Sequence, residues 1–161
     1  LNLIDTPGHV DFSYEVQRSL SACQGALLLV DCSQGIQAQT IATYEAAFTQ
    51  DLHVIPVLTK SDLPNARPKE VIAELKSMFD MSENEIIISS AKTGQGIPEI
   101  FAAIVREIPP PSGRLSHPLR AMLVDSWFQR HRGLVCLVQI VDGDLRKGDR
   151  IRKCPLCALV S

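Results

Sequence analysis

The sequence lacks an excess of charge of either sign, a long hydrophobic run and a regular set of cysteine pairs. Its net charge of −2 excludes a broadly basic nucleic-acid-binding chain, and we expect no sequence-specific DNA partner. No apolar run approaches the roughly 18 residues that a membrane-spanning helix requires. What is present, 161 residues with 45% hydrophobic content, suffices for a sizeable core and about one and a half domains.

The cysteines exclude a further class. They number five and are scattered along the chain, so a disulfide framework is not expected. Cys154 and Cys157 have the spacing of half a zinc site or of a redox pair. Because no second Cys or His pair accompanies them, we expect no metal there.

The opening stretch carries the first functional pattern. Residues 1–4 are mostly apolar and are followed by an acid and a Pro-Gly pair, which predicts a buried strand that stops at Asp5. Asp5 is suited to hold Mg²⁺ through water, and Gly8 allows a backbone N–H to approach a phosphate closely. His9 follows with a group able to orient a water. The alternative is an ordinary turn in which the acid caps the next helix.

Two later polar clusters also follow apolar strands. Residues 59–62 come after the predicted strand 54–58, and residues 90–92 come after the predicted strand 86–88. Parallel strands place their carboxyl ends at one edge of a sheet, where open α/β sheets bind ligands. We therefore expect both clusters and Asp5 to form a nucleotide site.

The three clusters resemble the guanine-nucleotide-binding signatures of GTPases: Asp-x-x-Gly, Asn/Thr-Lys-x-Asp and Ser-Ala-Lys. A carboxylate such as Asp62 can accept hydrogen bonds from both the ring N–H and the exocyclic amine of guanine, whereas adenine would leave it unpaired. The resemblance implies that Lys60 lies along the base, that the backbone of Ser90 and Ala91 contacts the guanine carbonyl, and that Lys92 stacks on the other face of the base. Thr59 stands where Asn is commoner, which weakens that contact without changing the base preference. The implied GTP-binding residues are Asp5, Thr6, Pro7, Gly8, His9, Thr59, Lys60, Asp62, Ser90, Ala91 and Lys92.

The resemblance narrows to translational GTPases and, among these, to the elongation factor 4 or LepA family. Residues 5–12 read Asp-Thr-Pro-Gly-His-Val-Asp-Phe, and residues 13–25, 35–40, 108–111 and 125–128 fit the same family. The family implies a ribosome-stimulated enzyme that hydrolyses GTP to GDP, with Mg²⁺ as cofactor and His9 as the catalytic residue that positions water. It also implies action on stalled or mis-translocated ribosomes, which promotes the fidelity of protein synthesis.

The implied location is the mitochondrion. Residues 21–25 resemble the mitochondrial members of the family most. Those members imply the matrix side of the inner membrane, with peripheral membrane contact. A bacterial cytoplasm or a plastid is the alternative.

The order of elements predicts an α/β fold of the doubly wound P-loop NTPase type, followed by the start of an antiparallel β-barrel. Strands alternate with amphipathic helices as far as residue 108, and one helix is expected to begin at Pro68. Three prolines at 109–111 then form a stiff spacer. We expect a partial GTP-binding domain over 1–111, a linker over 112–117, and a partial barrel of three strands over 118–161.

The chain is expected to be a fragment. Its first residue is Leu1, and the resemblance places the phosphate loop and the first strands upstream. The tail 153–161 departs from the family pattern. A truncated, non-catalytic piece without the phosphate loop therefore remains an alternative. A P-loop ATPase of another family is a third reading, which Asp62 and the Ser90 cluster disfavour together.

Overall fold

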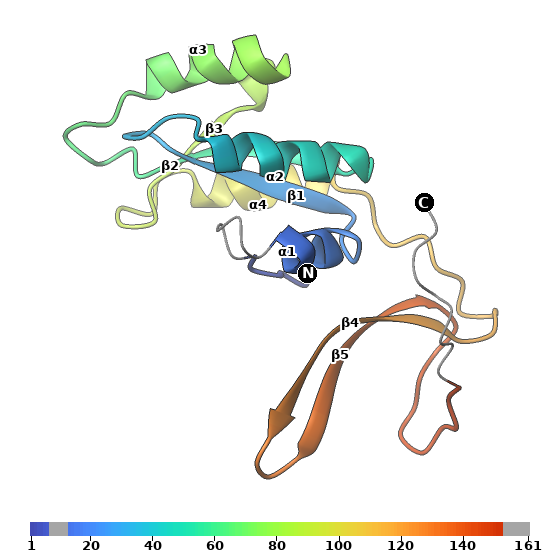
Figure 1. Ribbon diagram of the computed structural model, residues 1–161. Helices are drawn as coiled ribbons and strands as arrows, with labels where there is room; N and C mark the ends of the chain where they lie inside the picture. Colours follow the sequence, from blue (N-terminus) through green and yellow to red (C-terminus); the bar gives the residue numbers. More distant parts are fainter. Residues whose placement is uncertain (7–12, 153–161) are drawn as a thin grey trace. The chain divides into compact units, whose positions relative to one another are not determined.

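The computed structural model describes residues 1–6 and 13–152, and the chain divides into two compact units (Figure 1). The first is Leu1–Pro111 and the second is Ser112–Ser161.

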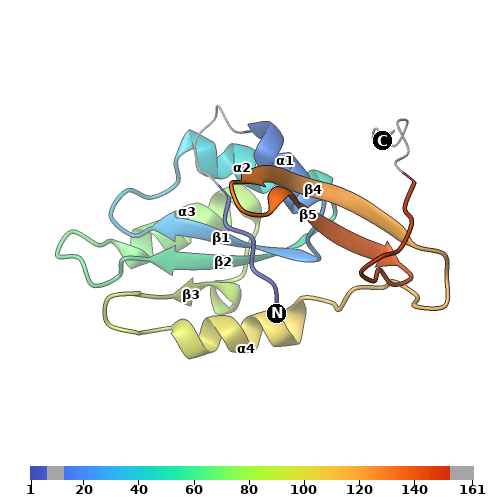
Figure 2. The same cartoon turned by 90° about the horizontal axis from the view of Figure 1, so that it is seen from below.

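The first unit is built on a parallel sheet. Its strands, in spatial order, are β1 (Gly25–Asp31), β2 (His53–Thr59) and β3 (Ile87–Ile88). The register of β1 and β2 pairs Asp31 with Thr59, so the two strands end level with each other. The three arrowheads point the same way in Figure 2. The predicted α/β class with a parallel sheet is confirmed.

Helices follow the strands in alternation. They are α1 (Ser13–Leu20), α2 (Ala38–Thr49), α3 (Pro68–Phe79) and α4 (Ile97–Glu107), with a short 3₁₀ turn η2 (Glu83–Glu85). α3 begins at Pro68 as predicted, because proline has a helical φ and no N–H to satisfy. α4 follows Gly96, whose φ is +75° and where a Cβ would lie 2.2 Å from the carbonyl oxygen of Ile88. Among the described helices, none has the length and apolar character needed to cross a membrane.

The helices cover both faces of the sheet. On one face, Val71 and Leu75 of α3 pack against Leu28, Val30 and Leu58. On the other face, α4 packs through Ala103 and Ile104 against β2, and Figure 2 shows α3 and α4 on opposite sides. A smaller cluster joins α1 to α2. The residues with no exposed surface at the centre are Cys32, Ile55, Val57, Leu58, Val71 and Leu75.

One strand prediction was wrong, and another was wrong at its first residue. Residues 1–4, predicted as a buried strand, form no strand, and the side chains of Leu1 and Leu3 are 80% and 69% exposed. A strand is stabilised by a neighbour that completes its backbone hydrogen bonds, and the described residues supply none here. The strand predicted over 86–88 starts one residue late, because the N–H of Ile86 closes the η2 turn onto Glu83.

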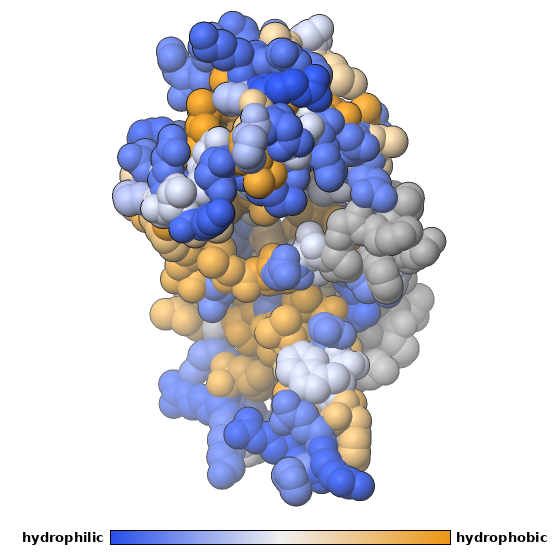
Figure 3. Space-filling model, turned by 90° about the vertical axis from the view of Figure 1, so that its left-hand side faces the viewer, coloured by the Kyte–Doolittle hydropathy of each residue, from blue (hydrophilic) through white to orange (hydrophobic). Residues whose placement is uncertain are grey.

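The second unit is a two-stranded antiparallel hairpin, β4 (Arg120–Gln129) and β5 (Gly133–Asp142). Its only buried apolar side chain among the described residues is Val124. Apolar residues lie on its surface instead, as Figure 3 shows, and Phe128 and Leu134 are 76% and 68% exposed. The third barrel strand predicted for this unit is not among the elements of the described residues, and 153–161 lie outside them.

The base of the hairpin is fastened by one carboxylate. Asp142 accepts a hydrogen bond from the backbone N–H of Arg114 at 3.0 Å and lies 3.1 Å from the guanidinium of Arg120. These contacts hold the pKa of Asp142 below its usual range. They also attach Arg114 to the hairpin.

The division into a linker over 112–117 and a barrel domain over 118–161 stays a prediction.

Candidate functional site

The loops that follow the three parallel strands meet at the carboxyl edge of the sheet. The N–H of Cys32 donates to the carbonyl of Thr59 at 3.0 Å, which joins the loop after β1 to the loop after β2. The N–H of Ser61 donates to the carbonyl of Ser89 at 3.2 Å, which joins the loop after β2 to the loop after β3. The structure thus brings the clusters 59–62 and 90–92 together.

Asp62 and Ser90 form the closest contact between the two clusters. The hydroxyl of Ser90, which is fully buried, donates to Oδ1 of Asp62 at 2.6 Å. This hydrogen bond holds the pKa of Asp62 below its usual range, so the exposed carboxylate is ionised at neutral pH. A charged acceptor is therefore fixed in place with its second oxygen unengaged by Ser90.

Lys60 is oriented by a residue from the neighbouring loop. Its ammonium lies 2.7 Å from Oδ2 of Asp31, and its backbone has a left-handed φ of +57°. The other oxygen of Asp31 accepts from the backbone N–H of Ser33 at 2.8 Å and from its hydroxyl at 2.6 Å. The bonds from Lys60 and Ser33 lower the pKa of Asp31 to about 2.

Thr59 and Ser61 differ in how their hydroxyls are used. The hydroxyl of Thr59 donates to the carbonyl of Val30 at 3.3 Å, so it serves the contact between the strands. The hydroxyl of Ser61 is buried and has no hydrogen-bond partner, alone in this respect among buried side-chain N and O atoms of the described residues. A buried hydroxyl without a partner costs free energy, and a bound polar group that reached it would remove that cost.

In the loop 90–92, both backbone polar groups of Ser90 form hydrogen bonds. The N–H of Ser90 donates to Gln95 at 3.0 Å, and its carbonyl accepts from Gly94 at 2.9 Å. Ala91 and Lys92 are exposed. Of the two residues predicted to present backbone to a base, Ala91 is the one with an exposed position.

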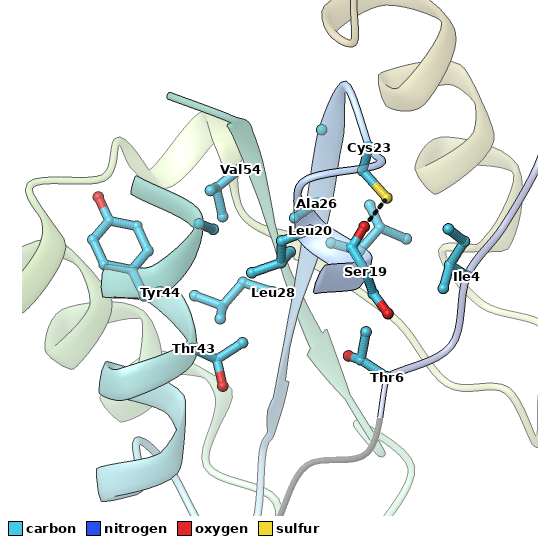
Figure 4. Close-up of a pocket in the computed structure, with 13 residues that line it drawn as sticks. Ile4, Thr6, Ser19, Leu20, Cys23, Ala26, Leu28, Thr43, Tyr44 and Val54 are labelled. Carbon is cyan, nitrogen blue, oxygen red and sulfur yellow. Dashed lines mark hydrogen bonds between the residues drawn. The ribbon is translucent and has the colours of Figure 1, made fainter. Parts of the chain in front are cut away.

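Asp5 and Thr6 are not joined to these clusters by any hydrogen bond or ion pair of the described residues. Asp5 is exposed, and Thr6 lines a cavity of about 90 Å³ with Ile4 and residues of α1, β1 and α2 (Figure 4). In this cavity Cys23 donates from its thiol to the carbonyl of Ser19 at 3.2 Å, and burial raises the pKa of that thiol. The remaining predicted residues of this stretch, Pro7, Gly8 and His9, lie outside the described residues.

Metal ligands are not clustered in residues 1–6 and 13–152, where no group of three His, Cys, Asp or Glu side chains could hold an ion. Cys154 and Cys157 lie outside that part of the chain. A single carboxylate such as that of Asp5 can still hold Mg²⁺ through water, because Mg²⁺ keeps several waters and takes few protein carboxylates.

Sequence reasoning missed Asp31, Ser33 and Glu74 as parts of this edge. Glu74 of α3 accepts from the N–H of Ile36 at 3.2 Å and so supports the loop after β1. The signal that could have found Asp31 is the one that selected Asp5, an acid at the carboxyl end of a predicted parallel strand. Ser33 and Glu74 carry no such signal.

Known proteins match nearly all of this chain. Residues 1–110 match the family described as elongation factor Tu GTP binding domain. A protein of Ricinus communis named translation factor GUF1 homolog, mitochondrial, is 56% identical over 151 residues, which cover 94% of this chain and 22% of that protein. Its namesake in Phytophthora infestans is 57% identical over 152 residues, covering 94% of this chain and 23% of that protein.

A fungal relative gives the same picture. Translation factor GUF1, mitochondrial, of Laccaria bicolor is 54% identical over 154 residues, which cover 96% of this chain and 24% of that protein. The chain therefore spans under a quarter of the length of these relatives.

Proposed function

Because this chain belongs to the elongation factor Tu GTP-binding domain family, we propose that it carries the guanine-reading part of a translation factor that hydrolyses GTP to GDP. The observation that carries the proposal is the contact of Asp62 with Ser90, which unites the two clusters at one sheet edge. An ionised, fixed carboxylate suits recognition of two N–H donors on one base edge. The high identity to mitochondrial translation factors supports the elongation factor 4 type.

In this proposal each residue of the edge has a distinct role. Asp62 accepts from guanine, and Lys60 lies along the base with its aliphatic stem. Ala91 presents its backbone to the guanine carbonyl, with Ser90 holding Asp62 in place. Lys92 covers the other face of the base, and Ser61 offers its unpartnered hydroxyl.

The hydrolytic roles are proposed for the residues that precede α1. Asp5 would hold Mg²⁺ through water, and Mg²⁺ supplies charge neutralisation at the phosphates. Thr6, Pro7 and Gly8 complete the phosphate-facing stretch, and Gly8 allows close approach of its N–H. His9 orients the attacking water, and positioning provides most of the rate. The ribosome is the proposed activator.

The proposed setting is the mitochondrial ribosome, at which the protein would act on stalled or mis-translocated complexes. The names of its relatives support the mitochondrion. The matrix side of the inner membrane, with peripheral membrane contact, is proposed from the resemblance alone.

The base-reading role is tested by nucleotide competition. A fluorescent GDP is bound to the whole protein that carries this chain and displaced with GDP, xanthosine diphosphate or ADP. We expect displacement by GDP and none by ADP. Asp62→Asn should weaken GDP binding on the order of 100-fold and favour xanthosine diphosphate, because an amide presents a donor where guanine also presents one. Equal displacement by ADP would support the ATPase reading instead.

The hydrolytic role is tested separately at His9. His9→Ala should remove ribosome-stimulated GTP hydrolysis while leaving GDP affinity unchanged, because His9 acts on the water and not on the base. Single-turnover phosphate release with and without ribosomes measures this. Unchanged stimulated turnover would refute the role of His9, and wild-type binding without turnover would favour the non-catalytic reading.

A further inference from the structure

Two of the side chains proposed to meet the base, Asp62 and Lys60, are each held by a partner outside their own loop. Asp62 is held by Ser90 from the loop after β3. Lys60 is held by Asp31 from the end of β1, although Asp31 belongs to none of the three nucleotide-binding signatures. The second of these contacts has no role in the function proposed above.

Asp31 is unusually well fixed for a residue near a surface. Its side chain is 15% exposed, and its carboxylate receives the Lys60 ammonium on one oxygen and two bonds from Ser33 on the other. Its backbone lies in register with Thr59, the residue before Lys60. The carboxylate is therefore a rigid point to which the lysine is tied.

Lys60, by contrast, would be mobile without this tie. Its side chain is 60% exposed and has a flexible four-carbon stem. The stem loses conformational freedom when a ligand orders it. Its backbone is already set, since φ is +57° and its carbonyl accepts from Leu63 at 3.2 Å. The ion pair with Asp31 thus restricts the side chain of Lys60, which its fixed backbone would otherwise leave mobile. Restricting a side chain before the ligand arrives reduces the entropy lost on binding.

We propose that Asp31, fixed by Ser33, is a positioning residue of the nucleotide site that holds Lys60 in the orientation required to lie along a guanine base. Asp31 itself does not touch the nucleotide. The inference rests on the proposed function, because it assigns Asp31 a role through Lys60 in guanine binding.

The test is a double-mutant cycle on fluorescent GDP affinity in the whole protein that carries this chain. Asp31→Asn removes the charge and keeps an oxygen for Ser33. We expect it to weaken GDP binding about tenfold, as expected for loss of preorganisation at one side chain. Lys60→Met should weaken binding by at least as much, and Asp31→Asn should then have no further effect in the Lys60→Met background.

Two further variants keep the test sharp. Ser33→Ala should weaken GDP binding in the same direction but by less, because it loosens Asp31 without removing its charge. Glu83→Gln is the matched control, since it also removes one carboxylate of an ion pair, with Lys76 at 3.3 Å, but lies outside the three loops of the site. It should leave GDP affinity unchanged. Urea midpoints of all variants identify any that fail to fold.

The outcomes separate the two proposals. If Asp31→Asn weakens binding equally with and without Lys60, Asp31 is a general structural residue and the inference is wrong. It is also wrong if Asp31→Asn leaves affinity unchanged or raises it. If the wild-type protein does not bind GDP, or binds ADP equally well, the proposed function fails and the inference fails with it.

Discussion

In the first unit polar loops stand on a closed core, whereas in the second a hairpin exposes apolar side chains on its surface. Beneath the loops, Ile55, Val57, Leu58, Val71 and Leu75 have no exposed surface. In the hairpin only Val124 is buried among the described apolar residues. Two strands alone are marginally stable in water, because they bury little. The difference teaches that the candidate site rests on a buried core, whereas the described residues of the hairpin bury little apolar surface.

The two units also differ in charge. Residues 112–161 hold nine of the 16 Lys and Arg residues but only four of the 18 Asp and Glu residues. The first unit is therefore acidic and the second basic, although the whole chain has a net charge of −2. A small total charge can thus conceal two regions of opposite sign.

The largest effect that tests the difference between the two units is expected from loss of core packing. Leu75→Ala should destabilise the first unit by about 2–5 kcal/mol, because Leu75 is fully buried and the change leaves a cavity. Leu134→Ala, at an exposed hairpin position, should change stability by less than about 0.5 kcal/mol. Urea unfolding followed by helical circular dichroism reports the first unit, since all described helices lie there.

Fluorescence of Trp127, the only tryptophan, reports the hairpin in the same samples. It should not respond to Leu75→Ala. If both substitutions shifted both signals equally, the two units would unfold as one and the comparison would be wrong.

A smaller effect is expected from replacing two glycines that share the same backbone φ. Gly35 in the site loop and Gly133 in the hairpin both have a φ of +73°. Alanine at either position should cost about 1 kcal/mol because of the left-handed backbone. Gly35→Ala should cost more, because its Cβ would lie 2.9 Å from Oε2 of Glu74 and displace it from Ile36.

At Gly133 nothing lies within 4 Å of the added carbon. Midpoints from the same two signals measure both costs. A Gly133→Ala cost equal to or above that of Gly35→Ala would mean that the site loop is no more tightly packed than the hairpin turn.

The last effect concerns pH. The pKa of Asp31 is lowered from 3.8 to about 2 in the folded protein, so its charged form stabilises folding fully above the unfolded pKa. This contribution is lost as the pH falls from 3.8 toward 2. Asp142 has a lowered pKa as well, so the hairpin should also weaken in acid.

Urea midpoints recorded between pH 5 and pH 2 check this. Asp31→Asn should flatten the pH dependence of the helical signal, and Asp142→Asn should flatten that of Trp127 fluorescence. The comparison is broken if Asp31→Asn alters the acid response of the hairpin and leaves that of the helices intact.

Much of the first unit follows from sequence because its signals are local. The start of α3 at Pro68 agrees with the prediction, and β2 (His53–Thr59) exceeds the predicted strand 54–58 by one residue at each end. Both elements depend on neighbouring residues. The resemblance to mitochondrial-type translation factors of the elongation factor 4 family is also confirmed.

What could not be predicted depends on distant partners. The ion pair between Asp31 and Lys60 joins residues 29 positions apart in the sequence. The motif that contains Lys60 does not indicate which carboxylate it contacts. Residues 1–4 have a strand-like pattern, but a pattern cannot supply a neighbouring strand. The roles of the site residues stay predictions, and those of Pro7, Gly8 and His9 concern positions outside the described residues.

The level ends of β1 and β2 also set rules for insertions and deletions. Side chains alternate between the two faces of a sheet, so removing one residue within either strand would turn its terminal side chain to the opposite face. Asp31 and Thr59 would then no longer match across the ladder. A loss of two residues would restore the face but shorten the strand. Length variation in this region should therefore be confined to the turns at the amino ends of these strands.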